Sequence, residues 1–226
     1  MYKYDTHVHT REVSPCGHVK AREVVQLYKE MGYDGIIITD HYYDDFFQSL
    51  GKISWEDKIE TYLDGYKKAV EEGNKIGITV LLGIELRFTE NYNDYLLYGM
   101  TEEFLKENPE LYTLGLKEFS RLIEKQDILL FQAHPYRKGM EVADPQYMHG
   151  IEVFNGNPRH DSKNHKALSF ARKNSLLMSS GSDFHQVEDV AKGGILVSEK
   201  ITNVKELVKA MRNNTEKNLI CAEKIL

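Results

Sequence analysis

Short apolar runs alternate with amphipathic stretches along most of this chain. The run Gly35–Thr39 is rich in β-branched residues, which is typical of a buried parallel strand. The stretch Ala21–Met31 carries its apolar side chains at helical spacing, and Gly32 stands where such a helix would end. A repeated order of strand and then helix predicts a mainly parallel sheet that is covered by helices.

The same pattern predicts the individual elements. The expected strands are Tyr2–Val8, Gly35–Thr39, Thr79–Phe88, Tyr95–Tyr98, Ile128–His134, Ile151–Phe154, Leu176–Ser180 and Gly194–Val197. The expected helices are Ala21–Met31, Trp55–Lys75, Leu116–Lys125, Lys163–Lys173 and Asn203–Asn213. Ser54 and Asn203 are expected to cap two of these helices. No linker or repeat divides residues 1–226, so we expect one domain of the α/β class. A closed or nearly closed β/α barrel fits this length, and an open doubly wound sheet is the alternative.

Composition narrows the classes of protein. Hydrophobic residues make up 41% of the chain and aromatic residues 11%, enough to build a core. The net charge of −6 argues against a nucleic-acid partner that is bound by broad phosphate neutralisation. No segment approaches the roughly 20 apolar residues of a membrane helix, and the N-terminal residues lack the apolar region of a signal peptide. With only two cysteines, Cys16 and Cys221, a reducing compartment is the simpler interpretation, so we expect a cytoplasmic protein without a membrane partner.

Histidine and carboxylate residues gather where the predicted strands end. The segments are Asp5–His9, Thr39–His41, Gly83–Glu85, Ala133–Arg137 and Gly181–His185. In parallel β/α folds the carboxyl ends of the strands form one face, so residues distant in sequence are expected to converge there. Alternate residues of a strand share a face, so His7 and His9 are expected to point the same way. Neutral imidazole and carboxylate groups suit zinc, manganese and iron, and the lack of a cysteine cluster argues against a structural thiolate zinc site.

These motifs, in their order along the chain, resemble those of the PHP (polymerase and histidinol phosphatase) superfamily. The residues that carry the resemblance are Asp5-x-His7-x-His9-Thr10, Ile38-Thr39-Asp40-His41, Gly83-Ile84-Glu85, Ala133-His134-Pro135 and Gly181-Ser182-Asp183-x-His185. The resemblance covers nearly the whole chain. It implies a single distorted (β/α)7 barrel, two or three divalent metal ions (zinc, manganese or iron) and the hydrolysis of phosphate esters.

The resemblance also implies which side chains bind the metals. One ion would be held by His7, His9, Glu85 and Asp183, a second would share Glu85 and take His134, and a third would take His41 and His185. His18 would complete the third site, with Glu12 as the alternative. In the second site Asp94 stands where the family often has a histidine, so either Asp94 is a ligand or that site is one ligand short.

Roles in catalysis follow from the resemblance and from residue type. The side chains expected to act in catalysis are Glu85, His134, Asp183 and His185. Arg137 is a candidate phosphate clamp, with an ordinary surface arginine as the alternative, and Arg159 is a second candidate. His160 is either a proton donor to the leaving group or an exposed loop histidine. Asp40 is expected to orient a neighbouring ligand rather than to bind metal itself.

The predicted function is therefore that of an enzyme, a metal-dependent phosphoesterase. Its expected partner is a small phosphorylated metabolite, with a monoester such as histidinol phosphate as one candidate. Two alternatives stay open: a PHP domain that only binds metal or serves in interactions, and a phosphodiesterase acting on nucleotides. Cys16 and Arg22 also form the C-x5-R spacing of cysteine-dependent phosphatases, but their loop is not rich in glycine and Glu23 stands where serine or threonine is usual. The choice of metal and the oligomeric state are left open.

Overall fold

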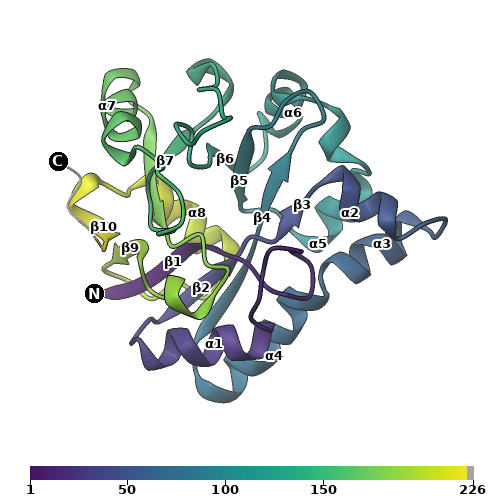
Figure 1. Cartoon of the computed structure of the whole chain (residues 1–226), viewed down its shortest axis with the longest axis horizontal. Coiled ribbons are helices and arrows are strands. Elements are labelled where there is room, and N and C mark those ends of the chain that lie inside the picture. The colour runs from purple at the N-terminus through teal and green to yellow at the C-terminus, as the bar shows by residue number, and fades with distance from the viewer. Residues whose placement is uncertain (223–226) are drawn as a thin grey trace.

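One continuous sheet of ten strands curls toward a barrel, with helices around its outside (Figure 1). The structure is a computed structural model, and it describes residues 1–222. The strands are β1 (Tyr2–Val8), β2 (Gly35–Ile38), β3 (His41–Tyr42), β4 (Thr79–Arg87), β5 (Asp94–Tyr98), β6 (Leu129–Gln132), β7 (Gly150–Asn155), β8 (Leu177–Gly181), β9 (Gly193–Val197) and β10 (Leu219–Cys221). The helices are α1 (Ala21–Glu30), α2 (Asp44–Ser49), α3 (Trp55–Tyr62), α4 (Asp64–Ile76), α5 (Glu102–Glu107), α6 (Leu116–Ile123), α7 (Asn164–Asn174) and α8 (Val204–Arg212).

Two helices begin directly after the residues that were expected to cap them. The Ser54 hydroxyl accepts the Asp57 N–H at 3.0 Å, and the Asn203 side chain accepts the Glu206 N–H at 3.0 Å. Both predicted caps are therefore confirmed. Four short elements, α2, α5, β3 and β10, lie in segments for which no element was expected.

The helix expected over Trp55–Lys75 is in fact two helices. The chain breaks at Leu63, where φ is −81° and ψ is 1°, and α4 begins at the next residue. The break brings Gly65 against the loop after β1, where an added Cβ atom would lie 3.2 Å from the Cβ atom of Thr10. The second helix thus supports the loop that follows the first strand.

The sheet is less parallel than expected. Its strand order is β10-β9-β1-β2-β4-β5-β6-β7-β8, with β3 paired to β4. Five pairings are parallel, but β4–β5, β5–β6, β1–β9 and β9–β10 are antiparallel. The segment 88–93 explains the first of these, because it is too short for the crossover that a parallel pair needs.

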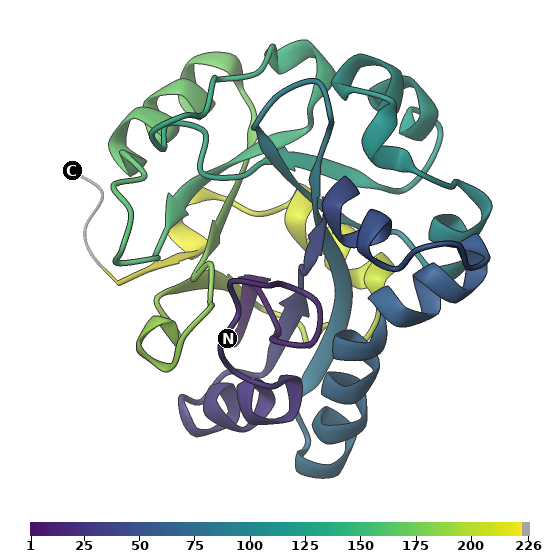
Figure 2. The same cartoon turned by 45° about the vertical axis from the view of Figure 1, so that its right-hand side comes forward.

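The barrel closes where the segment after β8 meets β1. Val8 and Phe184 form a parallel bridge, the His9 N–H donates to the Phe184 carbonyl at 3.1 Å, and the Phe184 N–H donates to the His7 carbonyl at 3.2 Å. Figure 2 shows the strands in the middle of the molecule and the helices around them. The nearly closed α/β barrel confirms the expected fold class, although it has more strands than seven.

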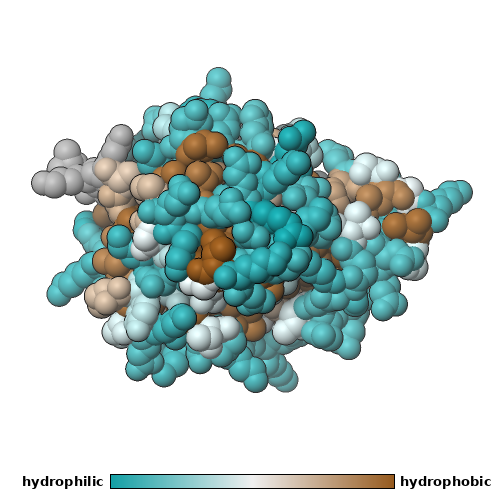
Figure 3. Space-filling view, turned by 90° about the horizontal axis from the view of Figure 1, so that it is seen from below, coloured by the Kyte–Doolittle hydropathy of each residue, from teal (hydrophilic) through white to brown (hydrophobic). Residues whose placement is uncertain are grey.

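The largest part of the core lies between the sheet and helices α2, α3, α5 and α6. Its centre is a group of stacked or edge-on aromatic rings, among them Tyr42, Phe47, Tyr62 and Tyr112. The face in Figure 3 is mainly hydrophilic, with apolar groups in small separate patches. Within residues 1–222 no helix is long and apolar enough to cross a membrane.

Candidate metal centre

Four imidazoles surround the carboxylate of Glu85, which is 1% exposed and lies in β4. The distances from their Nε2 atoms to the nearer Glu85 oxygen are 3.3 Å for His7, 3.5 Å for His9, 3.1 Å for His41 and 3.0 Å for His134. His7 lies in β1 and His9 directly follows that strand. His41 lies in β3, and His134 lies in the loop after β6. Residues that are up to 127 positions apart in sequence (134 − 7) therefore meet around one carboxylate.

The side chains form four overlapping groups whose ligand atoms lie within 4.8 Å of one another. The groups are His7–His9–Glu85, His7–His134–Asp183, Glu85–Asp94–His134 and His9–His41–His185. All of these side chains except those of His7 and His9 line a cavity of about 300 Å³. The four groups overlap, but each contains a different combination of ligands. Adjacent ions could therefore share a ligand such as Glu85, and the arrangement can hold more than one divalent cation.

Unpaired nitrogen atoms show that the cluster fits a metal ion. His7 Nε2 and His9 Nε2 are buried and have no hydrogen-bond partner within the described part of the protein. Both atoms face the same carboxylate oxygen of Asp183, at 3.5 Å and 3.4 Å. A buried polar atom without a partner is costly, and a cation between imidazole and carboxylate groups would satisfy all of them.

Glu152, which no sequence motif indicated, holds the first of these imidazoles. One of its oxygens lies 2.9 Å from His7 Nδ1, and the other accepts the His134 N–H and the Asn155 amide, each at 2.9 Å. A carboxylate on the second nitrogen of a metal-binding histidine fixes its tautomer and orientation. The only signal in the sequence is a single carboxylate inside the apolar strand Gly150–Asn155.

Asp40 acts on the second imidazole through a serine. Asp40 accepts a hydrogen bond from the Ser14 hydroxyl at 2.8 Å, and this hydroxyl lies 3.2 Å from His9 Nδ1. Asp40 also accepts the Thr10 N–H at 2.6 Å and belongs to none of the four groups. This is the position expected of a carboxylate that orients a ligand.

Two of the clustered residues are among the six non-glycine residues of the described chain that adopt a positive φ. His134 has a φ of 27° and Asp183 a φ of 52°, in the left-handed region that costs a residue other than glycine about 1–3 kcal/mol. Such conformations persist where the surrounding structure over-determines them, and they are frequent at functional sites.

Comparison with known proteins assigns the family. A sequence profile described as the PHP domain matches residues 5–220. The chain belongs to the PHP domain family. No curated protein sequence matches it significantly.

Solved structures share the fold of this PHP domain at low sequence identity. A two-domain protein from Bacteroides vulgatus that contains a predicted PHP-like metal-dependent phosphoesterase has a TM-score of 0.62 and 20% identity, over 93% of this chain and 63% of its own length. A protein from Bifidobacterium adolescentis proposed to be a metal-dependent phosphoesterase has a TM-score of 0.57 and 15% identity, over 94% and 96%. An amidohydrolase from Chromobacterium violaceum, with bound sulfate and no metal, has a TM-score of 0.55 and 15% identity, over 98% of both chains. This chain thus spans less than two thirds of the Bacteroides protein.

The remaining candidate ligands of the PHP domain differ in how they are placed. His185 lies in a group with His9 and His41, whereas His18 is exposed and belongs to none of the four groups. Asp94 Oδ2 lies 3.9 Å from His134 Nε2.

The alternative ligand Glu12 instead accepts the Ala21 N–H at 3.0 Å, at the start of α1. Here the carboxylate stabilises a helix end rather than facing the cluster.

Arg87, a second residue that the motifs did not indicate, stands beside Asp94. Its guanidinium binds both oxygens of Asp94, at 2.8 Å and 2.9 Å, and lies 4.2 Å from the centre of the Tyr43 ring. The Tyr43 hydroxyl also donates to Asp94 at 2.8 Å. Arg87 is two residues beyond Glu85 on the same strand, so the alternation of strand faces could have found it.

The predicted substrate residues all line the cavity. Arg137 donates to Asp183 at 2.7 Å and to Asn155 at 2.9 Å, and its Nε is buried without a partner in the described part of the chain. Arg159 forms a two-point ion pair with Asp189 at 2.5 Å and 2.6 Å. His160 is exposed at the rim of the cavity. The two arginines are thus already paired with carboxylates, although both guanidinium groups stay next to the space above the cluster.

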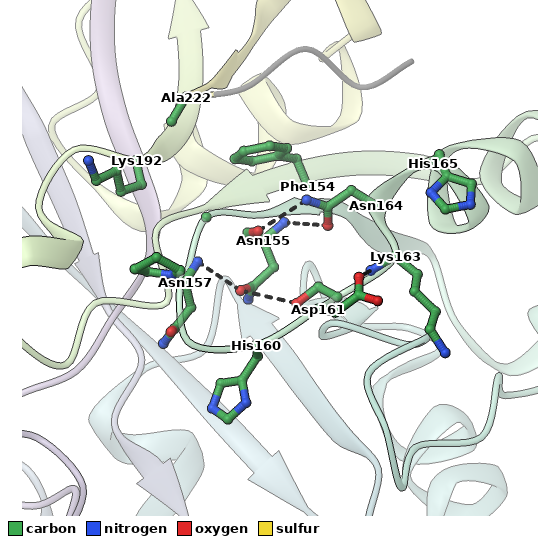
Figure 4. Close-up of a pocket in the computed structure, with 13 residues that line it drawn as sticks. Phe154, Asn155, Asn157, His160, Asp161, Lys163, Asn164, His165, Lys192 and Ala222 are labelled. Carbon is green, nitrogen blue, oxygen red and sulfur yellow. Dashed lines mark hydrogen bonds between the residues drawn. The ribbon is translucent and has the colours of Figure 1, made fainter.

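A second cavity of about 590 Å³ adjoins the first and shares Asn157 and His160 with it. Figure 4 shows Lys192 and Lys163 on opposite sides of this space, with His160 below them. Its wall is held by Asn155, whose backbone exchanges hydrogen bonds of 3.0 Å and 3.1 Å with the Asn164 side chain. Polar and cationic side chains thus continue from the metal cluster into the neighbouring space.

Burial and neighbouring charges set the protonation of the cluster. Burial lowers the pKa of His7, but the carboxylates of Glu152, Asp183 and Glu85 outweigh it and raise that pKa well above its usual value. The pKa of His9 is lowered well below its usual value by burial and by the His185 and His41 imidazoles. Before any metal binds, the His7 imidazole is therefore in its charged form, with both nitrogens protonated, whereas the His9 imidazole is neutral.

Metal affinity is expected to rise with pH through the neutral range. A metal ion must displace the proton on His7 Nε2. Below the pKa of this group, the apparent metal affinity therefore rises about tenfold for each unit by which the pH increases. Calorimetric titration in buffers of different ionisation enthalpy measures both the affinity and the number of protons released. An affinity that does not change with pH, without proton release, would contradict the assignment of that proton to His7.

The substitution Glu152→Gln is expected to weaken metal binding by about 10–100-fold without unfolding the protein. Glutamine has nearly the same shape but no charge, so His7 keeps a neighbour while its orientation and basicity change. The matched control is Glu118→Gln, because Glu118 is exposed on α6. Equal metal affinities of the two variants would show that Glu152 does not support a metal ligand.

Proposed function

We propose that this PHP domain is an enzyme that hydrolyses the phosphate ester of a small metabolite with the help of two or three divalent metal ions. The observation that carries the proposal is the set of four imidazoles around the buried Glu85 carboxylate, two of them with unpaired Nε2 atoms. Family membership supports it, because a predicted PHP-like metal-dependent phosphoesterase shares the fold.

The metal ligands in this proposal are the clustered residues described above. They are His7, His9, His41, Glu85, Asp94, His134, Asp183 and His185. Bound divalent ions would supply Lewis acidity toward a phosphoryl oxygen and would make water nucleophilic near neutral pH. Zinc, manganese and iron all suit this donor set of imidazole and carboxylate groups.

The protein itself contributes orientation and charge. Glu152 and the Asp40–Ser14 pair hold His7 and His9 in fixed directions, so the ligands need little rearrangement. The guanidinium groups of Arg87 and Arg137 stand at the wall of the cavity and place positive charge where phosphoryl oxygens would lie. His160 at the rim is the residue best placed to give a proton to a departing alcohol.

The dimensions of the site favour a small substrate. The cavity over the cluster measures about 300 Å³, which suits a phosphoryl group with a compact alcohol. The adjoining space, with Lys163 and Lys192, suits a polar or anionic leaving group. A phosphate monoester such as histidinol phosphate is of this size. We also propose that the protein acts in the cytoplasm, where Cys16 and Cys221 would stay reduced.

A panel assay tests the proposal. Purified protein is loaded separately with zinc, manganese and iron(II), its metal content is measured, and phosphate release is followed with small monoesters, nucleotide diesters and carboxamides. We expect turnover of at least one class of small monoester, and its loss on treatment with a strong chelator. Activity only on diesters would move the function to nucleotide phosphodiesters, and activity only on carboxamides to amide hydrolysis. Metal binding without any turnover would favour a metal-binding or interaction domain.

A further inference from the structure

We propose that Asn155 is a positioning residue, which fixes the direction of the Arg137 guanidinium group so that it can bind a phosphoryl oxygen of the substrate. The inference rests on the proposed function, in which Arg137 places positive charge beside the phosphoryl group. Asn155 lines the larger cavity of about 590 Å³, whereas Arg137 lines the cavity over the cluster. Asn155 would therefore act through Arg137 and not by touching the phosphoryl group itself.

An irregularity in β7 decides where the Asn155 side chain points. In a regular strand, residues three positions apart face opposite sides of the sheet, so Glu152 and Asn155 would be separated. The pairing of β7 with β8 shifts between Glu152 and Phe154, as a β-bulge does. The two side chains therefore reach each other, and the Asn155 amide donates to Glu152 Oε2 at 2.9 Å.

The backbone of Asn155 is held on both sides. Its N–H donates to Asn164 Oδ1 at 3.0 Å, and its carbonyl accepts a hydrogen bond from Asn164 Nδ2 at 3.1 Å (Figure 4). The next N–H, that of Gly156, donates to the Gly181 carbonyl at 2.8 Å. Asn155 is 4% exposed. Its side chain thus starts from a fixed and buried position.

The side-chain amide of Asn155 uses both its donor and its acceptor groups. Its Nδ2 donates to Glu152 Oε2 at 2.9 Å and to Asp183 Oδ2 at 3.2 Å. Its Oδ1 accepts Arg137 Nη2 at 2.9 Å and the Asn157 N–H at 3.2 Å. A reversed amide would set its NH2 group against two donors and its oxygen against two carboxylates, so the contacts select one orientation.

Arg137 is anchored through a single nitrogen atom. Nη2 carries two hydrogens, and its nearest acceptors are Asp183 Oδ2 at 2.7 Å and Asn155 Oδ1 at 2.9 Å, with the Ser162 hydroxyl further away at 3.4 Å. Two hydrogen bonds in different directions fix the plane of the guanidinium group, whereas one would let it turn. Nη1 makes no hydrogen bond with the described residues, so it is available to a phosphoryl oxygen.

A neutral amide suits this role better than a second carboxylate. Asp183 divides its oxygens, because Oδ1 faces His7 Nε2 and His9 Nε2 at 3.5 Å and 3.4 Å while Oδ2 binds Arg137. Asn155 adds a second anchor without adding a second negative charge. The guanidinium group is therefore held in place while it keeps more of its positive charge for an anionic substrate.

A double-mutant cycle tests whether Asn155 acts through Arg137. The Kd for inorganic phosphate is measured by calorimetry on wild type, Asn155→Ser, Arg137→Ala and the double variant, all loaded with manganese to the same measured content. Serine is uncharged and one atom too short to keep the contact. We expect Asn155→Ser to weaken phosphate binding about tenfold, or about 1.4 kcal/mol, when Arg137 is present, and less than about twofold in the Arg137→Ala background.

A second variant and a control accompany the cycle. Asn155→Asp keeps the shape of the side chain but sets a negative charge beside Arg137, so it is expected to weaken phosphate binding at least as much as Asn155→Ser. The matched control is Asn213→Ser, because Asn213 is exposed at the end of α8, where its amide donates to the Lys209 carbonyl. Its phosphate affinity is expected to stay within about twofold of the wild type.

The outcomes separate this inference from the proposed function. Equal weakening by Asn155→Ser in both backgrounds would show that Asn155 acts on the structure in general and would overturn the inference. Unchanged phosphate affinity in Arg137→Ala or in both Asn155 variants, or the failure of both Asn155 variants to fold, would overturn it as well. A wild type that hydrolyses a monoester but binds no phosphate would overturn the inference alone. A wild type that does neither would overturn both proposals.

Discussion

The substitution Glu85→Gln is expected to lower the rate of hydrolysis by roughly 10³-fold or more. Glu85 is the carboxylate that four imidazoles approach within 3.0–3.5 Å, so it is the natural shared ligand of adjacent ions. Glutamine keeps the shape of the side chain but has no charge, and its amide nitrogen cannot bind a cation. The rate is measured with the best substrate of the panel at saturating metal, together with the metal content of the protein.

The control for this variant is again Glu118→Gln, which changes the same group on the exposed face of α6. Circular dichroism shows whether Glu85→Gln keeps its secondary structure. A folded variant that retains the metal content and turnover of the wild type would refute the central position of Glu85.

The substitution His134→Asn is expected to remove one bound metal ion and to lower hydrolysis by about 10²-fold or more. His134 Nε2 lies 3.0 Å from Glu85 and 3.9 Å from Asp94, so it is the only imidazole that approaches both carboxylates within the described residues. Asparagine is chosen because it tolerates the left-handed backbone, with a φ of 27°, that residue 134 adopts. The number of bound ions is measured by elemental analysis, and turnover by phosphate release.

The comparison with His134→Ala separates the imidazole from the backbone. Alanine loses the imidazole and also tolerates a positive φ less well than asparagine, so its free energy of unfolding is expected to be about 1 kcal/mol lower. Both variants are expected to lose the same metal ion. Wild-type metal content and rate in either variant would show that His134 is not a ligand.

Much of the fold could be predicted from the hydrophobic pattern. Strands β1, β2 and β4 and helices α1, α7 and α8 lie within one or two residues of their expected bounds, because their apolar residues form either a continuous buried run or a regular strand or helix spacing. Most partners and directions of the strands could not be predicted. The segment before β5 is too short for a parallel crossover, but nothing in the long segment after it indicates that β5 is also antiparallel to β6.

The candidate ligands could be predicted because their motifs are local. His7 and His9, or Asp183 and His185, are recognisable from two or three adjacent positions. Glu152 acts through a contact with His7, which is 145 positions away, and Ser14 acts on His9 only because both fold against Asp40, so no motif marks either residue.

The amino-acid sequence by itself determined the α/β class, most of the elements and the residue types of a metal centre, since periodicity and short motifs are properties of neighbouring residues. Only the tertiary structure decided which of them meet. Asp94 is the clearest case, because it begins rather than ends its strand and would lie at the opposite edge of a parallel sheet. The antiparallel register that pairs Asp94 with Arg87 brings it to the edge where Glu85 and His134 lie. The short segment 88–93 already requires the antiparallel direction of β5, but the place of Asp94 beside His134, 40 positions further along the chain, depends on contacts between distant residues that no local pattern marks.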